Sequence, residues 1–140
     1  MTKEYKHKTV SGFFTAHSDR WIKGAYSKGE KINGKLVTCF CLAGKVNNIH
    51  KDVEDQKSAM RKLADAIEEL HPKIYKKILD NYPANHAILN LKKSIKDLHP
   101  TVYKQIIKNN TMPSTIVVDF NDHPSRTIRE IIEVAQYAAV

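Results

Sequence analysis

Hydrophobic residues recur at helical spacing along most of this chain, in segments separated by proline, glycine and asparagine. Between residues 53 and 70 the apolar stripe consists of Val53, Met60, Leu63, Ala66, Ile67 and Leu70. Acidic residues at 52, 54 and 55 lie at its start, where the positive end of a helix dipole favours them. Pro72 ends this helix, because the residue before a proline avoids helical angles, and proline is accepted at the first position of the next helix. The pattern predicts a long helix, a corner at His71-Pro72 and a second, short helix.

This unit is duplicated. Residues 63–81 return 28 places later as residues 91–109, with 9 of 19 positions identical. The identical positions of the first copy are Leu63, Ile67, Leu70, His71, Pro72, Tyr75, Lys76, Ile78 and Asn81. Such agreement at a fixed offset indicates two copies of a helix–His-Pro–helix unit, too few for a solenoid. We predict a helix from Pro83 to Leu98, another from Pro100, and equivalent environments for Tyr75 and Tyr103.

The N-terminal third carries weaker signals. Residues 10–26 place apolar side chains at helical spacing and predict a helix that ends near Gly24. Residues 27–36 contain the Asn33-Gly34 pair, which is typical of turns, so a loop or a small hairpin is expected there. Residues 37–49 are apolar nearly all round and predict one buried element, for which helix is favoured over strand.

The C-terminal third contains one segment of high strand propensity. Residues 114–120 (STIVVDF) are apolar without alternation, which predicts a short buried strand or a covered extended segment. Thr127 followed by Glu130 is the pattern of a capping box, and a final helix should bury Ile131 and Ala135.

Together these elements predict a mainly α fold, with residues 1–140 forming a single compact helical domain of about seven helices. We expect at most one short strand pair, involving residues 115–120, and read residues 70–110 as a possible helical insertion. The apolar fraction of 41% and charged fraction of 27% are typical of a soluble globule. No signal-peptide-like start and no apolar run long enough to span a bilayer are found, so we expect a cytoplasmic protein.

The formal net charge of +8 is unevenly distributed. Residues 70–110 hold eight lysines against two acidic residues, and only four of the 23 cationic residues of the chain are arginines. These lysines form a candidate binding surface: Lys73, Lys76, Lys77, Lys92, Lys93, Lys96, Lys104 and Lys108. A basic surface of this kind binds acidic proteins or phosphates, although reading base edges depends largely on arginine.

The densest polar cluster lies near the C-terminus. Asn121, Asp122 and Arg126 are candidate binding residues, and with His123 they allow two interpretations. In the first, Asp122 orients His123 as a base and Arg126 holds an anion. In the second, which we favour, the cluster is structural: Asp122 and Thr127 cap backbone amides and Arg126 pairs with Asp122.

Three short motifs resemble a family of small uncharacterised proteins of bacteria and phages. They are W-I-K-G-A at residues 21–25, C-L-A-G at 41–44, and F-N-D-x-x-x-R-T-x-x-E at 120–130. The family typically shows W-x-x-G-A, C-x-x-G-A and W-N-D-x-x-x-R-T-x-x-E. This chain departs from it at Phe120 and Lys45, and by the inserted residues 70–110. The resemblance implies a compact, mostly helical domain and no established activity.

Catalytic signatures are lacking in the sequence: it has no glycine-rich phosphate loop and no G-x-S-x-G or H-E-x-x-H motif. The seven histidines show no zinc-ligand spacing, Cys39 and Cys41 are best explained as small buried residues, and we expect no metal or cofactor. We therefore expect stoichiometric binding of a host or cellular macromolecule, a protein rather than a nucleic acid, as by a phage-type host-directed inhibitor or counter-defence protein. The alternatives are nucleic-acid or nucleotide binding through the lysine-rich helices, and an enzyme built on residues 121–126.

Overall fold

A computed structural model of the chain describes residues 8–82 and 99–140. Its elements follow in the order α1 (Val10–Ala16), the 3₁₀ turn η1 (Ser18–Arg20), β1 (Ser27–Ile32), β2 (Lys35–Phe40), α2 (Leu42–Ile49), α3 (Val53–Leu70), α4 (Pro72–Asp80), α7 (Pro100–Asn109), α8 (Pro113–Asp122) and α9 (Ile128–Tyr137). The described residues thus form seven α-helices and one antiparallel hairpin, which confirms the predicted mainly α class.

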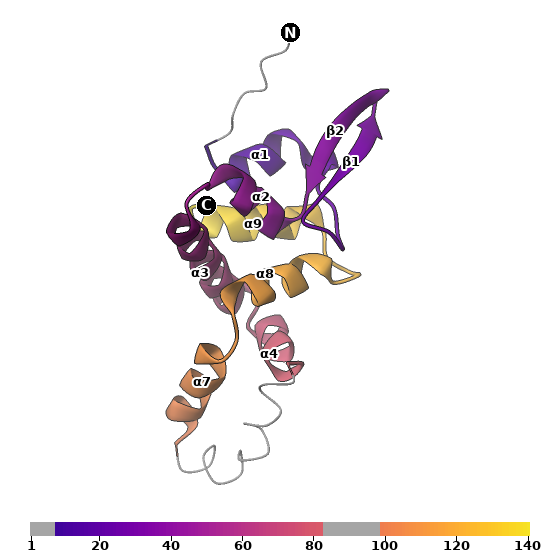
Figure 1. Ribbon diagram of the computed structural model, residues 1–140. Helices are drawn as coiled ribbons and strands as arrows, with labels where there is room; N and C mark the ends of the chain where they lie inside the picture. Colours follow the sequence, from indigo (N-terminus) through magenta and orange to yellow (C-terminus); the bar gives the residue numbers. More distant parts are fainter. Residues whose placement is uncertain (1–7, 83–98) are drawn as a thin grey trace.

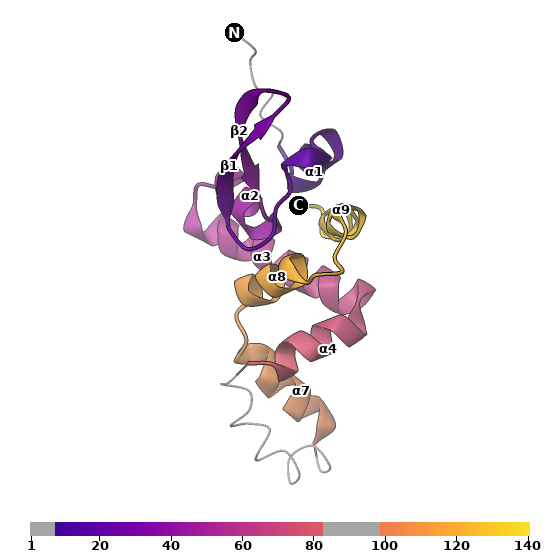
Figure 2. The same ribbon diagram turned by 90° about the vertical axis from the view of Figure 1, so that its right-hand side faces the viewer.

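Helix α3 is the central element of the core. It packs against α2, α4, α8 and α9, while α1 packs against α2 and α9 (Figure 1). Each of these helices except α4 contributes to the largest fully buried side chains. They include Phe14, Leu42, Leu63, Ile67, Ile116, Phe120, Ile131 and Val134. The β1–β2 hairpin extends from one end of this core, and α4 and α7 lie at the opposite end (Figures 1 and 2).

The proline-marked corners form as predicted. Asp52 caps α3 by accepting hydrogen bonds from the amides of Glu54 and Asp55, and Pro72 and Pro100 open α4 and α7. His71 (φ −134°, ψ 60°) and His99 (φ −143°, ψ 67°) adopt the same backbone conformation. Tyr75 and Tyr103 are both buried, as the duplication predicts. The helix predicted from Pro83 to Leu98 lies outside the described residues.

Residues 27–40 form a hairpin, the second of the two possibilities left open for residues 27–36. Asn33 (φ 52°) and Gly34 (φ 78°) connect the strands with positive φ at both central positions, which matches the twist of the flanking strands. Ile32 pairs with Lys35 beside the turn, and Ser27 pairs with Phe40 at the base of the hairpin.

The helix predicted over residues 10–26 is wrong in its length. Helix α1 ends at Ala16, one 3₁₀ turn follows, and the chain then runs beside β2, where the Ile22 amide donates to the Phe40 carbonyl at 3.0 Å. Gly24 turns the chain with φ +82°. Pairing with a strand distant in sequence thus overrides the helical spacing of Trp21 and Ile22.

The single buried element predicted over residues 37–49 is also wrong. It divides at Cys41 into β2 and α2. The Cys41 sulfur accepts the Gly44 amide at 3.2 Å and so caps α2, while the Cys41 amide donates to the Tyr26 carbonyl at 3.2 Å.

The strand predicted over residues 114–120 is a helix, and the strand pair lies instead at residues 27–40. Pro113 opens α8, which buries Ile116, Val117, Phe120 and Asn121 on one helical face. Burial of this face against α2, α3 and α4 outweighs the strand preference of the β-branched residues. In the described part of the chain, no helix combines the length and apolarity that a bilayer crossing needs.

Candidate functional site

The three sequence motifs meet around the side chain of Asn121, at the end of α8. Asn121 is fully buried. Its Oδ1 accepts from the Trp21 indole at 2.6 Å and from the Leu42 amide at 3.0 Å. Its Nδ2 donates to the Ile22 carbonyl at 3.0 Å and to Asp122 Oδ1 at 2.9 Å. Two acceptor and two donor positions are all that an amide side chain offers, so Asn121 has no group left for a ligand.

Asp122 and Pro124 bind residues 23 and 24, which follow the Trp21 and Ile22 partners of Asn121. The Asp122 Oδ1 accepts the Gly24 amide at 3.0 Å, and Lys23 Nζ donates to the Pro124 carbonyl at 3.0 Å. The segment of residues 21–24 is thus fastened to residues 121–124. The prediction that Asp122 caps the adjacent helix is wrong, because its carboxylate accepts the amide of Gly24, 98 residues away, and Thr127 alone caps α9.

Gly44 allows the second motif to join the other two. A Cβ atom at this position would lie 1.8 Å from the Tyr26 carbonyl oxygen, which is backbone and has little room to shift. The close approach of α2 to residue 26 therefore requires glycine at position 44.

Arg126 is an internal group. Its side chain is almost completely buried, with the guanidinium carbon 3.8 Å from the centre of the Phe120 ring. Its Nε donates to the Phe120 carbonyl at 2.8 Å and its Nη1 to Glu130 at 2.9 Å, while Nη2 has no hydrogen-bond partner among the described residues. The predicted pairing of Arg126 with Asp122 is therefore replaced by pairing with Glu130.

Glu130 completes the capping box predicted with Thr127. The Thr127 hydroxyl accepts the Glu130 amide, and the Glu130 carboxylate accepts the Thr127 amide at 3.0 Å. Burial by itself would raise the pKa of Glu130, but the Thr127 amide and the Arg126 charge outweigh it and lower the pKa overall. The carboxylate is thus held ionised between a helix cap and a buried cation.

The enzymatic interpretation of this cluster finds no support in the geometry. His123 is exposed, and its Nδ1 lies 2.8 Å from the Ser125 hydroxyl, while the Asp122 carboxylate binds Gly24 and Asn121. The two cysteines are free and buried, and burial raises the pKa of each thiol. Among residues 8–82 and 99–140, no group of three His, Cys, Asp or Glu side chains is placed to hold a metal ion.

The candidate lysines divide into three sets. Lys73, Lys76 and Lys77 on α4 and Lys104 on α7 are exposed, and none makes an ion pair with another described residue. Lys108 lies 3.4 Å from Asp65 and 3.5 Å from Glu68, so it fastens α7 to α3. The remaining three, Lys92, Lys93 and Lys96, lie outside the described residues. Helices α4 and α7 together are called the basic arm below.

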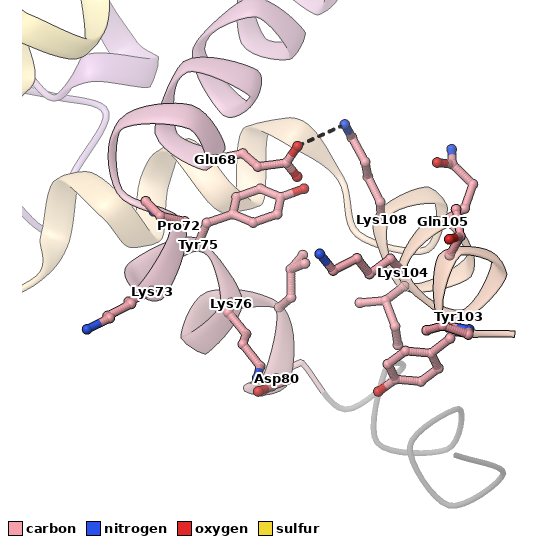
Figure 3. A pocket seen from close by; sticks show the side chains of 14 residues that line it. Glu68, Pro72, Lys73, Tyr75, Lys76, Asp80, Tyr103, Lys104, Gln105 and Lys108 are labelled. Carbon is pink, nitrogen blue, oxygen red and sulfur yellow. Dashed lines mark ion pairs between the residues drawn. The ribbon is translucent and has the colours of Figure 1, made fainter. Parts of the chain in front are cut away.

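A cleft of about 630 Å³ lies between the two helices of the basic arm (Figure 3). Its apolar lining comes from Pro72, Tyr75 and Leu79 on α4 and from Tyr103 and Ile107 on α7. Lys73, Lys76 and Lys104 also line it, as do Glu68 and Lys108, while Lys77 does not. We call this space the arm cleft.

Tyr75 brings a polar group to the arm cleft. Its side chain is 6% exposed, and its buried hydroxyl lies beside the Glu68 carboxylate in Figure 3, although the pair falls outside ordinary hydrogen-bond distance. Burial, together with the nearby carboxylates of Glu68 and Asp65, raises the pKa of Tyr75, so the hydroxyl stays protonated at neutral pH. Glu68 is the side chain that shares this proton most directly.

Sequence reasoning missed both the arm cleft and the internal role of Lys108. The equal offset of Tyr75 and Tyr103 from the two prolines was the available signal, because it places both rings on the inner faces of matching helices. No protein-family model, curated protein or solved structure matches this chain. The resemblance to bacterial and phage proteins therefore stays a prediction.

Proposed function

We propose that this protein acts by stoichiometric binding to an acidic surface of another protein, through the basic arm. One observation carries the proposal. Lys73, Lys76, Lys77 and Lys104 are exposed on two helices that border an apolar cleft, and no described acidic residue pairs with them.

Unpaired like charges on one surface repel one another. Lys73 and Lys77 stand four residues apart on α4, a spacing at which like charges destabilise a helix by about 0.2–0.5 kcal/mol. An acidic partner replaces this repulsion with attraction and also speeds the encounter of the two molecules. Binding is thus favoured by the same charges that disfavour the isolated arm.

The basic arm suits a protein better than a nucleic acid. Neither α4 nor α7 contains arginine, the residue most used to read base edges. The rings of Tyr75 and Tyr103 are buried, so they offer no open face on which a base can stack. An apolar cleft contributes to binding only when the partner also brings apolar side chains.

Catalysis is not needed for this function. The polar groups of Asn121, Asp122 and Arg126 are mostly taken up by contacts within the chain. The resemblance to phage proteins extends the proposal to a target in the host cell, which makes a host-directed inhibitor or counter-defence protein the form of binding we expect.

The test is capture from host lysate by the immobilised chain, with and without nuclease. The arm variant carries Lys73→Glu, Lys76→Glu, Lys77→Glu and Lys104→Glu. The control variant carries the same change of charge at four exposed lysines outside the arm: Lys31, Lys35, Lys51 and Lys62. We expect a nuclease-resistant protein to be captured by the unchanged and control chains and lost from the arm variant.

Two outcomes would contradict the proposal. Capture that is equally weakened in both variants would mean that net charge, rather than the arm, drives binding. Capture abolished by nuclease, together with affinity for generic nucleic acid that falls steeply with salt, would identify the nucleic-acid alternative.

A further inference from the structure

The two outer edges of the β1–β2 hairpin differ in how they are covered. The edge of β2 is occupied, because the Phe40 carbonyl accepts the Ile22 amide at 3.0 Å and the Thr38 carbonyl accepts the Arg20 guanidinium at 2.7 Å. Strand β1 is the one farther from α1 in Figure 1. Among residues 8–82 and 99–140, no hydrogen bond reaches its outer edge. An open strand edge is a template for pairing with another strand.

The register of the hairpin identifies the main-chain groups on this open edge. Gly29 pairs with Thr38, and Ser27 pairs with Phe40. In an antiparallel ladder, pairs that bond to each other alternate with pairs whose amides and carbonyls point apart. The carbonyls of Thr38 and Phe40 point away from β1, so the main-chain groups of their partners point away from β2. Ser27, Gly29 and, by the same alternation, Lys31 therefore present their amides and carbonyls on the open edge.

An exposed leucine lies beside this edge. Leu36 on β2 is 75% exposed, more than any other large hydrophobic side chain of the described residues. Its Cδ1 atom lies 3.5 Å from the position that a Cβ atom of Gly29 would take. The side chain thus leans across β1 towards the open edge, where a second strand would cover it.

The sequence of β1 is complementary to itself when two copies run antiparallel. If Gly29 pairs with Gly29 of a second copy, Ser27 lies opposite Lys31, and every outward main-chain group meets another outward group. In the same register Lys28 lies opposite Glu30 of the second copy, and symmetry repeats this pair. Opposite charges that face each other across two strands stabilise a sheet.

Other antiparallel registers are less favourable. A shift of one residue sets outward main-chain groups against groups that already bond to β2. A shift of two residues restores the main-chain bonds, but it places Lys28 opposite Lys28 or Glu30 opposite Glu30. Like charges directly opposite each other destabilise a sheet. The register centred on Gly29 therefore satisfies both the main chain and the charges.

We propose that the open edge of β1 pairs with the same edge of a second copy of this chain, antiparallel and centred on Gly29. The two hairpins then form one continuous sheet in a symmetric dimer, with the same patch used by both copies. The two Leu36 side chains meet beside the symmetry axis, while Ser27 and Lys31 contribute only main-chain groups. The dimer goes beyond the proposed function, since the basic arm lies at the opposite end of the core (Figure 1).

Sedimentation velocity of the full chain across a concentration series tests the dimer. A single pair of strand edges forms a small interface, so we expect monomer at about 1 μM and mainly dimer at about 0.5 mM. A chain that is still monomeric at about 1 mM would overturn the inference.

Charge reversal at two positions tests the register. Lys28→Glu sets glutamates opposite each other, Glu30→Lys sets lysines opposite each other, and each variant should self-associate roughly tenfold more weakly. The two changes move the net charge in opposite directions, so net charge does not explain a loss in both. The double variant, which carries both changes, restores opposite charges and should regain dimer to within about threefold.

An equimolar mixture of the two single variants separates pairing between chains from pairing within one. Lys28 and Glu30 also form an ion pair of 3.3 Å within each chain, and both single variants lack it. In the mixture only the pairs between chains are restored, so we expect mixed dimers to form. Failure of the mixture to associate, or self-association of both single variants at full strength, would contradict the proposed register.

An apolar variant and its control test the contribution of the leucine. Leu36→Ser should weaken self-association roughly tenfold. Met112→Ser changes a side chain that is 68% exposed but lies outside the hairpin, and it should leave self-association unchanged. Equal losses in the two variants would contradict the role of Leu36.

Amide exchange measured by NMR at low and high concentration locates the interface. The amides of Lys28 and Glu30, which face β2, should exchange slowly at both concentrations. Those of Gly29 and Lys31 should exchange slowly only in the dimer. Protection that appears in another element, with Gly29 and Lys31 unchanged, would place the interface elsewhere and overturn the inference.

Discussion

The polar side chains around Asn121 bond within the chain, whereas four lysines of the basic arm are exposed to solvent. In the cluster, the amide of Asn121 makes four hydrogen bonds, and Asp122 and Arg126 are also engaged within the chain. In the arm, four lysines are exposed without an ion pair to any described residue. The dense polar motif of the sequence thus holds the fold together, whereas these scattered lysines of the arm are exposed to solvent, as the proposed binding requires.

The largest effect should come from breaking the cluster at its centre. Asn121→Ala leaves the Trp21 indole, the Leu42 amide and the Ile22 carbonyl without their partner, and each unpaired buried group costs about 1–3 kcal/mol. We expect the free energy of unfolding in urea to fall by about 3–5 kcal/mol. Asn47→Ala, an exposed asparagine on α2, should change it by less than about 0.5 kcal/mol. Unchanged stability of Asn121→Ala together with lost capture would contradict this structural role and identify Asn121 as a binding residue.

The second effect concerns the close approach that joins the motifs. Gly44→Ala places a Cβ against the Tyr26 carbonyl, so α2 must shift, and we expect the unfolding free energy to fall by about 2–3 kcal/mol. Gly29→Ala is the matched control, because its Cβ would lie at an ordinary 3.5 Å from the Leu36 side chain. Equal stability of the two variants, measured by thermal unfolding, would contradict the packing described for residue 44.

A smaller effect depends on pH. Glu130→Gln removes the charge that faces Arg126, and should cost about 1–2 kcal/mol of unfolding free energy at pH 7. The folded-state pKa of Glu130 lies below its usual value of 4.5, so its contribution is present above about pH 4.5 and is lost as the pH falls through the folded-state pKa. The difference in unfolding free energy between the unchanged chain and Glu130→Gln should therefore disappear in acid. A difference that persists at the lowest pH at which both proteins fold would show that the charge of Glu130 is not its origin. Glu133→Gln, at an exposed position of the same helix, serves as control.

The smallest effect separates two lysines within the arm. Lys108→Ala breaks the contacts with Asp65 and Glu68 and should lower the unfolding free energy by about 0.5–1 kcal/mol. Lys104→Ala should leave stability within about 0.5 kcal/mol and weaken capture of the partner. A loss of stability in Lys104→Ala, together with a loss of capture in Lys108→Ala, would contradict this assignment.

Local signals predicted the parts of the fold that depend on neighbours in sequence. Pro72, Pro100 and the Thr127 capping box mark helix ends through contacts within a few residues, and all three were placed correctly. Residues 114–120 were misassigned because strand propensity is a local measure, whereas burial of α8 against α3 decides their conformation.

The site was only partly predictable for the same reason. The sequence indicated that residues 121–126 hold one another or cap a helix, but three of the four partners of Asn121 lie 79 to 100 residues away, where no local spacing points to them. The exposure of Lys73, Lys76 and Lys77 follows from helical periodicity. The pairing of Lys108 with α3 does not, since it depends on how α7 sits against another helix.

Backbone amide hydrogen exchange, with and without the captured partner, tests the contrast between the two regions most directly. We expect slower exchange in α4 and α7 on binding, and unchanged exchange in residues 21–26 and 120–127. Slower exchange confined to residues 21–26 and 120–127, with α4 and α7 unaffected, would contradict it.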